Sequence, residues 1–180
     1  MKVILISDIH GSYTYLKKVI DVFEKEKADK LIILGDILYH GPRNPLPEGY
    51  DCKKVAELLN QYSNKIIAVR GNCDAEVDQM MLDFDIRQDY QTVDIDGHHF
   101  FLTHGHIYGP DKLPVLNTGD IFVYGHFHKP VAQRYEDIYM LNPSSIALPK
   151  EGTNSYGIYE KDVFTIKGFN NAQIKTITFL

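Results

Sequence analysis

The segment KVILISDIHG, residues 2–11, begins with an apolar, β-branched run and ends in two potential ligands, Asp8 and His10. A run of this kind is typical of a short strand that is covered on both faces. Two similar segments follow, KLIILGD at residues 30–36 and KIIAVRGN at residues 65–72. The three segments share one plan, in which a buried strand leads to polar residues beside a glycine.

Two amphipathic segments separate these strands, at residues 15–27 and 51–62. Their apolar residues recur every three or four positions, as on one face of a helix. These residues are Leu16, Val19, Ile20 and Phe23 in the first segment, and Val55, Leu58 and Leu59 in the second. The order β-α-β-α-β predicts a parallel sheet with right-handed crossovers.

The second half of the chain changes to short strands separated by turns. The predicted elements are a hairpin over 91–105, a strand over 120–126, a hairpin over 131–143 and several strands over 155–179. Few helices are expected after Leu116. We therefore predict one α/β domain over residues 1–180, with two packed sheets, helices outside them and a largely antiparallel C-terminal half.

Composition narrows the class of protein. The chain has 180 residues, of which 44% are apolar and 24% charged, an ordinary globular balance. Its net charge of −5 argues against a protein that tracks long nucleic acid. The first apolar run is too short for a signal segment or a membrane span. Because Cys52 and Cys73 form no spaced framework, a reducing compartment and a cytoplasmic protein are expected.

Acceptor-type side chains gather at the ends of five predicted strands. They are Asp8 and His10, Asp36, Asn72 and Asp74, His104 and His106, and His126 and His128. Each alone has an ordinary explanation, as a turn residue, a helix N-cap or a solvent-facing histidine. Since open α/β sheets bind ligands outside the carboxyl ends of their strands, their joint occurrence predicts one site.

The chemistry of these side chains indicates metal ions. Neutral imidazoles with carboxylates suit Mn, Fe, Zn or Ni rather than Ca or Mg alone. Two Asp, one Asn and at least four His, with one histidine of THGH taken as a ligand and the other as a neighbour, give seven ligands. Seven are too many for one tetrahedral ion and suit two ions that share a bridging carboxylate. By contrast, we expect His98 and His99 to be exposed hairpin residues, and His40 lies either near the site or simply on the surface.

The blocks DIHG, GD, GNCD, THGH and GHFH, in this order, resemble the motifs of the calcineurin-like metallophosphoesterases. The segments GDILYHGPRNPLPEGY, VRGNCDAEVDQM and NPSSIALPK are further similar to those of small bacterial phosphodiesterases in this family. The resemblance implies a four-layer α/β/β/α sandwich. It also implies that Asp8, His10 and His128 hold one ion, that Asn72, His104 and His126 hold a second, and that Asp36 bridges them.

Cys73 departs from the family pattern, because many relatives carry a histidine there that acts on the leaving-group oxygen or a phosphate oxygen. A thiol is only a weak donor. Asp74 orients that histidine in relatives, so its role in this chain is open. The candidate catalytic residues are Asp36, Asn72, Cys73 and Asp74.

The predicted function is hydrolysis of a small phosphodiester by a hydroxide that bridges two divalent ions, Mn²⁺ first, with Fe, Zn and Ni as alternatives. Without an acid at position 73, good leaving groups such as those of aryl diesters are favoured. A phosphomonoesterase or pyrophosphatase of the same family is the alternative. A non-catalytic scaffold is disfavoured because all seven ligand positions are filled.

Arg43 and Asn44 either face the substrate or belong to an exposed rigid loop. The resemblance also implies a homodimer or homotetramer.

Overall fold

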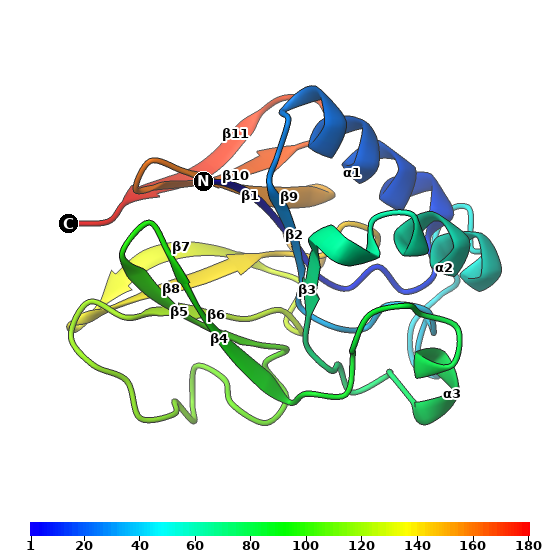
Figure 1. Ribbon diagram of the computed structural model, residues 1–180, viewed down its shortest axis with the longest axis horizontal. Coiled ribbons are helices and arrows are strands. Elements are labelled where there is room, and N and C mark those ends of the chain that lie inside the picture. The colour runs from blue at the N-terminus through cyan, green and yellow to red at the C-terminus, as the bar shows by residue number, and fades with distance from the viewer.

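The first sheet of the computed structural model, which describes residues 1–180, has the strand order β11-β10-β9-β1-β2-β3 (Figure 1). Its strands are β1 (Lys2–Ile6), β2 (Lys30–Ile33), β3 (Ile66–Ala68), β9 (Ser155–Glu160), β10 (Val163–Gly168) and β11 (Gln173–Thr178). The first three strands are parallel, as predicted, and the last three extend the sheet by antiparallel pairing. The carboxyl ends of β1, β2 and β3 therefore lie at one edge.

The second sheet has the order β4-β5-β6-β8-β7. Its strands are β4 (Tyr90–Ile95), β5 (His98–Thr103), β6 (Ile121–Val123), β7 (Pro130–Tyr135) and β8 (Ile138–Pro143). The C-terminal half is largely antiparallel, as expected, but β5, β6 and β8 are parallel to one another. The segments that follow β5 and β6 consequently leave the sheet on the same side.

Helices α1 (Tyr13–Lys25) and α2 (Cys52–Asn60) cover the outer face of the first sheet (Figure 1). Each begins at a side-chain cap, because Ser12 accepts a hydrogen bond from the Tyr15 amide and Asp51 one from the Lys54 amide. Two short elements complete the set, the 3₁₀-helix η1 (Ser63–Lys65) and α3 (Glu76–Gln79). None of these helices combines the length and the apolar character that crossing a membrane requires.

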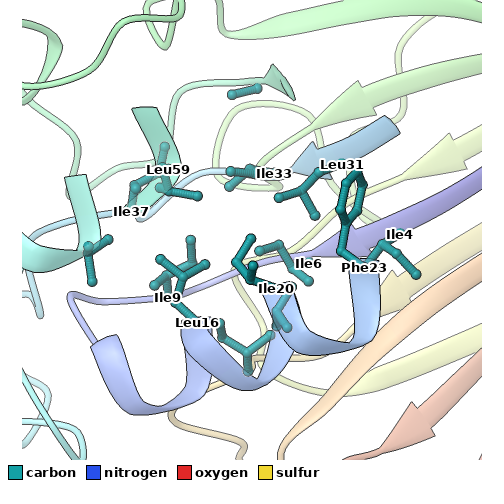
Figure 2. Packing of buried hydrophobic residues seen from close by; sticks show 14 of the residues in the cluster. Ile4, Ile6, Ile9, Leu16, Ile20, Phe23, Leu31, Ile33, Ile37 and Leu59 are labelled. Atoms are coloured by element: carbon teal, nitrogen blue, oxygen red, sulfur yellow. The ribbon is translucent and has the colours of Figure 1, made fainter. Parts of the chain in front are cut away.

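Strand β1 is covered on both faces, as its composition predicts. Ile4 and Ile6 point toward α1, where they pack with Leu16, Ile20 and Phe23 (Figure 2). The alternate residues of β1 join a second cluster that fills the space between the two sheets; they are Val3 and Leu5. All seven side chains are buried. This double burial anchors the end of β1, from which the DIHG segment leaves.

The outer face of the second sheet carries a third apolar cluster, which includes Phe101, Phe122 and Met140. Tyr108 and other apolar residues of segment 104–120 cover it. The α/β class and the two packed sheets are thus confirmed. The layer outside the second sheet differs in detail from the predicted helical layer. Segment 104–120 contains no helix and covers this face of the sheet as irregular chain.

Candidate metal centre

The loops that follow β1, β2 and β6 are joined by backbone hydrogen bonds. The His10 amide donates to the Asp36 carbonyl at 2.9 Å, and the Asp8 amide donates to the Gly35 carbonyl at 3.2 Å. Across the two sheets, the His126 amide donates to Asp8 Oδ2 at 3.0 Å. These contacts place predicted ligands from three strand ends side by side.

Close approach of the loops after β2 and β3 requires glycine. A Cβ atom on Gly71 would lie 2.1 Å from Asp36 Oδ1, and one on Gly35 would lie 2.5 Å from the Gly71 nitrogen. No L side chain fits in either position. The glycines of the GD and GN blocks therefore let Asp36 and Asn72 come together.

The backbone of most predicted ligands is strained. Five of the seven adopt a left-handed conformation, which is uncommon for residues other than glycine. They are Asp8 (φ 55°), His10 (φ 48°), Asp36 (φ 55°), His126 (φ 64°) and His128 (φ 57°). Such residues cost roughly 1–3 kcal/mol each and cluster at functional sites. Their concentration here indicates that the loops are shaped for a site rather than for stability.

The first group of side chains is the one predicted to hold the first ion. His128 Nε2 lies 3.0 Å from Asp8 Oδ1 and 3.4 Å from His10 Nε2. His10 Nε2 lies 3.6 Å from the same Asp8 oxygen. All three side chains are buried. These three donor atoms lie within 4.8 Å of one another, a spacing that suits ligands of a single cation.

The second predicted group lies beside the first. His104 Nε2 is 3.1 Å from Asn72 Oδ1 and 3.2 Å from His126 Nδ1. Asp36 Oδ2 lies between the groups, at 3.4 Å from His104 Nε2 and 3.7 Å from His10 Nε2. The structure thus brings together all seven residues that the sequence pointed to. Their function as ligands, and that of Asp36 as the bridge, stays a prediction.

The histidine rings are held by main-chain acceptors. The Nδ1–H groups of His10, His104 and His128 donate to the carbonyl oxygens of Tyr39, Leu34 and Leu148 respectively. This second bond fixes the tautomer and turns Nε2 toward the centre, as is usual for metal-bound histidine. His126 is the exception, because its Nδ1 is the atom that faces His104.

Electrostatics keeps the carboxylates ionised. Burial alone would raise the pKa of Asp8, but the neighbouring imidazoles of His10 and His128 outweigh it and hold that pKa well below its usual range. Burial opposes charge on His104 as well, yet the hydrogen bond to Asp36 and the charge of Asp8 raise its pKa to about 9. Imidazole protons thus balance the carboxylates. A divalent cation would replace these protons, so the donor set fits a metal centre that releases protons on binding.

Cys73 lies at the edge of this cluster and is protonated. Burial, followed by the charge of Asp36, raises the pKa of the thiol to about 12. Asn72 Nδ2 donates to its sulfur at 3.3 Å. A Cβ atom on Gly41 would lie only 3.1 Å from that sulfur, so the turn at residues 41–44 packs directly over Cys73. The half-buried thiol therefore contacts this turn on one side and lines the cavity above the cluster.

Asp74 has a structural task that sequence reasoning missed. Its Oδ2 accepts hydrogen bonds from the Gly71 and Asp36 amides at 2.7 and 2.9 Å, and its Oδ1 accepts one from Ile37 at 2.8 Å. Burial raises the pKa of Asp74 to about 6 although these amides lower it. The carboxylate ties the loops after β2 and β3 together, which makes Asp74 a positioning residue for Asp36. Its predicted catalytic role stays untested.

A cavity of about 790 Å³ opens above the two groups. Cys73 and five of the predicted ligands line it, and its wall includes Arg43 and Asn44. Three further wall residues, Tyr39, Phe127 and Lys150, were not singled out from the sequence. The sequence could have identified Phe127, because this residue lies inside the GHFH block. Lys150 and Tyr39 reach the cavity only because their loops fold over it.

Segment 142–148 was also missed as part of the site. Ser145 Oγ donates to the Asp8 carbonyl at 2.8 Å, and Asn142 Nδ2 donates to the Gly125 carbonyl at 2.8 Å. Leu148 supplies the acceptor for His128. These residues contact the loops that carry the predicted ligands, and each contact involves a main-chain carbonyl. No motif of reactive side chains therefore identifies them in the sequence.

His98 and His99 lie outside the cluster, and His106 borders it. His98 and His99 begin β5 and pair with Asp162 and Asp94 at 2.9 and 2.7 Å. His104 follows the other end of that strand, about 20 Å away at 3.3 Å per residue. His106 is exposed, with its ring 5.3 Å from that of His104.

His98→Ala and His99→Ala are expected to leave metal content almost unchanged, because neither side chain faces the centre. His104→Ala is the matched comparison and should remove close to one ion per chain. Elemental analysis of dialysed protein measures both. Loss of an ion from either hairpin variant would show that the predicted set of ligands is wrong.

Known proteins are similar to this chain in sequence and in fold. Residues 1–162 match the family model described as the calcineurin-like phosphoesterase superfamily domain. The chain is 50% identical to phosphodiesterase YfcE of Escherichia coli strain K12, over 97% of this chain and 95% of that protein. A solved structure of YfcE, described as a phosphoesterase from E. coli, matches with a TM-score of 0.98, 47% identity and full coverage of both chains. Phosphodiesterase MJ0936 of Methanocaldococcus jannaschii is 27% identical over 90% of this chain and 94% of its own.

Proposed function

This chain belongs to the calcineurin-like phosphoesterase superfamily, and from that premise we propose that it is a metal-dependent phosphodiesterase. The resemblance of its five motif blocks to this family is thereby confirmed. One observation carries the proposal: seven oxygen and nitrogen donors from five strand ends come together, and five of the seven residues line a 790 Å³ cavity. The relatives named phosphodiesterase support the diester as substrate.

The proposed centre would hold two divalent ions, with Asp36 as the shared ligand. When bound, such a pair activates water as a nucleophile at neutral pH and neutralises charge on the phosphoryl oxygens. Carboxylates and imidazoles together suit Mn, Fe, Zn or Ni, and of these we take Mn²⁺ first. The two free thiols, Cys52 and Cys73, support a reducing compartment, so we assign the protein to the cytoplasm.

The chain's own residues position and shield the reaction. Main-chain carbonyls fix the rings of His10, His104 and His128, so these ligands need no rearrangement when substrate arrives. Asp74 holds the loop of Asp36 in place. Cys73, which stays protonated, supplies neither a base nor an effective acid to the leaving oxygen. Departure of the alcohol therefore depends on its own acidity, which favours aryl diesters.

Stripping the metal and restoring it tests this function. Metal-free protein should hydrolyse bis(4-nitrophenyl) phosphate about 10³-fold more slowly or worse, and Mn²⁺ should restore the rate. The same series with Fe²⁺, Zn²⁺ and Ni²⁺ ranks the metals. 4-Nitrophenyl phosphate and inorganic pyrophosphate serve as comparison substrates, because faster turnover of either would favour the monoesterase or pyrophosphatase alternative. Absence of turnover on all three with every metal would support a scaffold instead.

A further inference from the structure

Two cationic side chains in the cavity wall are unused by the chemistry described so far. Arg43 and Lys150 both line the cavity, and neither pairs with a carboxylate. Lys129 shows the contrast, because it lies next to His128 in sequence but is paired with Glu151 outside the cavity. Unpaired cations that face a binding cavity are available to a ligand.

Both cations are carried by segments tied to the candidate ligands. The Lys150 amide donates to the His128 carbonyl at 2.9 Å, while His128 donates from its ring to Leu148. Arg43 belongs to the turn at residues 41–44, in which Asn44 Nδ2 donates to the His40 carbonyl at 2.8 Å. That turn packs over Cys73. The two side chains thus start from hydrogen-bonded main chain in the wall of the same cavity.

The charges in the cavity indicate which kind of group Arg43 and Lys150 bind. The phosphodiester group that is cleaved carries one negative charge, and the metal centre on the floor is sufficient to receive it. Two further positive charges in the wall are not needed for that group. Arg suits a phosphate or carboxylate through its planar fork, and Lys binds phosphate as a point charge. The wall is therefore matched to an anion that is separate from the scissile phosphate.

We propose that Arg43 and Lys150 bind a second anionic group of the substrate, so that the substrate class is a phosphodiester that also carries a phosphate or carboxylate. This inference rests on the phosphodiesterase function proposed above. Two aromatic rings in the same wall, Tyr39 (40% exposed) and Phe127 (36% exposed), offer flat apolar surface for the organic part that links the two anions.

A matched pair of chromogenic esters tests the proposal. Thymidine 5′-(4-nitrophenyl phosphate) and its 3′-phosphorylated form share the scissile bond and the leaving group, and they differ in one phosphate. With Mn²⁺, the 3′-phosphorylated ester should be preferred about tenfold or more in kcat/KM, mainly through KM. Arg43→Gln with Lys150→Gln should reduce this preference to near one. The control Arg134→Gln with Lys175→Gln removes the same charge from exposed positions and should keep it.

Binding measurements separate the two proposals. Thymidine 3′,5′-bisphosphate should bind the metal-loaded protein more tightly than thymidine 5′-phosphate by calorimetry, and the Arg43/Lys150 variant should lose this difference. Hydrolysis of both esters at equal efficiency by the native protein would overturn the second-anion site while leaving the phosphodiesterase intact. The second-anion site would also be overturned if the Arg43/Lys150 variant kept the preference for the 3′-phosphorylated ester. An equal fall of this preference in the Arg134/Lys175 control would overturn it as well. If neither ester is hydrolysed, the proposed function fails, and the binding difference still decides the anion site.

Discussion

Asp36→Asn is expected to abolish phosphodiester hydrolysis, with a loss of at least about 10³-fold, and to lower metal content at both positions. The substitution keeps the size of the side chain. The Asn oxygen can still accept from the Cys73 amide, as Asp36 Oδ1 does at 2.8 Å. What it removes is the negative charge at Oδ2, which faces His104 on one side and His10 on the other. When a ligand shared by two ions loses its charge, the binding of both ions is weakened.

Elemental analysis and turnover of bis(4-nitrophenyl) phosphate are measured on the same preparations. Asp111→Asn is the matched control, because this exposed carboxylate lies in segment 104–120 and not in the cavity wall. An unchanged thermal unfolding midpoint for Asp36→Asn would show that the loss does not come from unfolding. Two ions per chain with near-normal turnover would refute the bridging role, and loss of a single ion would make Asp36 a ligand of one position only.

Cys73→His is expected to raise hydrolysis of alkyl and cyclic nucleotide diesters by about 10²-fold or more, and that of aryl diesters far less. An imidazole can protonate the leaving oxygen, whereas the Cys73 thiol, with its pKa raised to about 12, cannot do so effectively. The benefit grows with the pKa of the leaving alcohol. Nitrophenolate departs without protonation, but a ribose hydroxyl does not.

Because Gly41 packs against Cys73, the Cys73→His experiment has to separate an effect of side-chain size from an effect of proton donation. A histidine ring that points toward the turn at residues 41–44, which carries Arg43, has to displace that turn, whereas a ring that points into the cavity does not. Cys73→Gln provides the control, because it is similarly bulky and polar but donates no proton of suitable pKa. Rates for both substrate types are measured with saturating Mn²⁺. Equal changes for the two leaving groups, or the same pattern in Cys73→Gln, would mean that the thiol serves packing and not substrate selection.

The structure changes how Asp74 can be used in that test. The family resemblance makes Asp74 the partner of a histidine at position 73, so Asp74→Ala would remove part of the gain. In this chain the Asp74 carboxylate already accepts hydrogen bonds from the amides of Gly71, Asp36 and Ile37. Its removal would loosen the loop of Asp36 with either residue at position 73, so Asp74→Ala does not isolate an effect on the ring.

The sequence alone determined the strand framework and the identity of the clustered side chains. Apolar runs such as 3–6 and 31–34 were recognisable because strands buried on both faces need no polar positions. Asp8, Asp36 and His104 were recognisable because carboxyl ends of parallel strands share an edge and because acceptor side chains beside glycine are rarely repeated by chance. These signals are local, and each can be read within about ten residues.

Only the tertiary structure decided how that cluster is held and what stands around it. Asp74 contacts the amide of Asp36, 38 positions earlier, and Ser145 contacts the carbonyl of Asp8, 137 positions earlier. Lys150 reaches the cavity because its amide bonds to the loop of His128. Such contacts depend on main-chain atoms and on the path of distant loops. Every residue except proline carries the same main-chain donor and acceptor, so no pattern of side chains predicts which of them will meet.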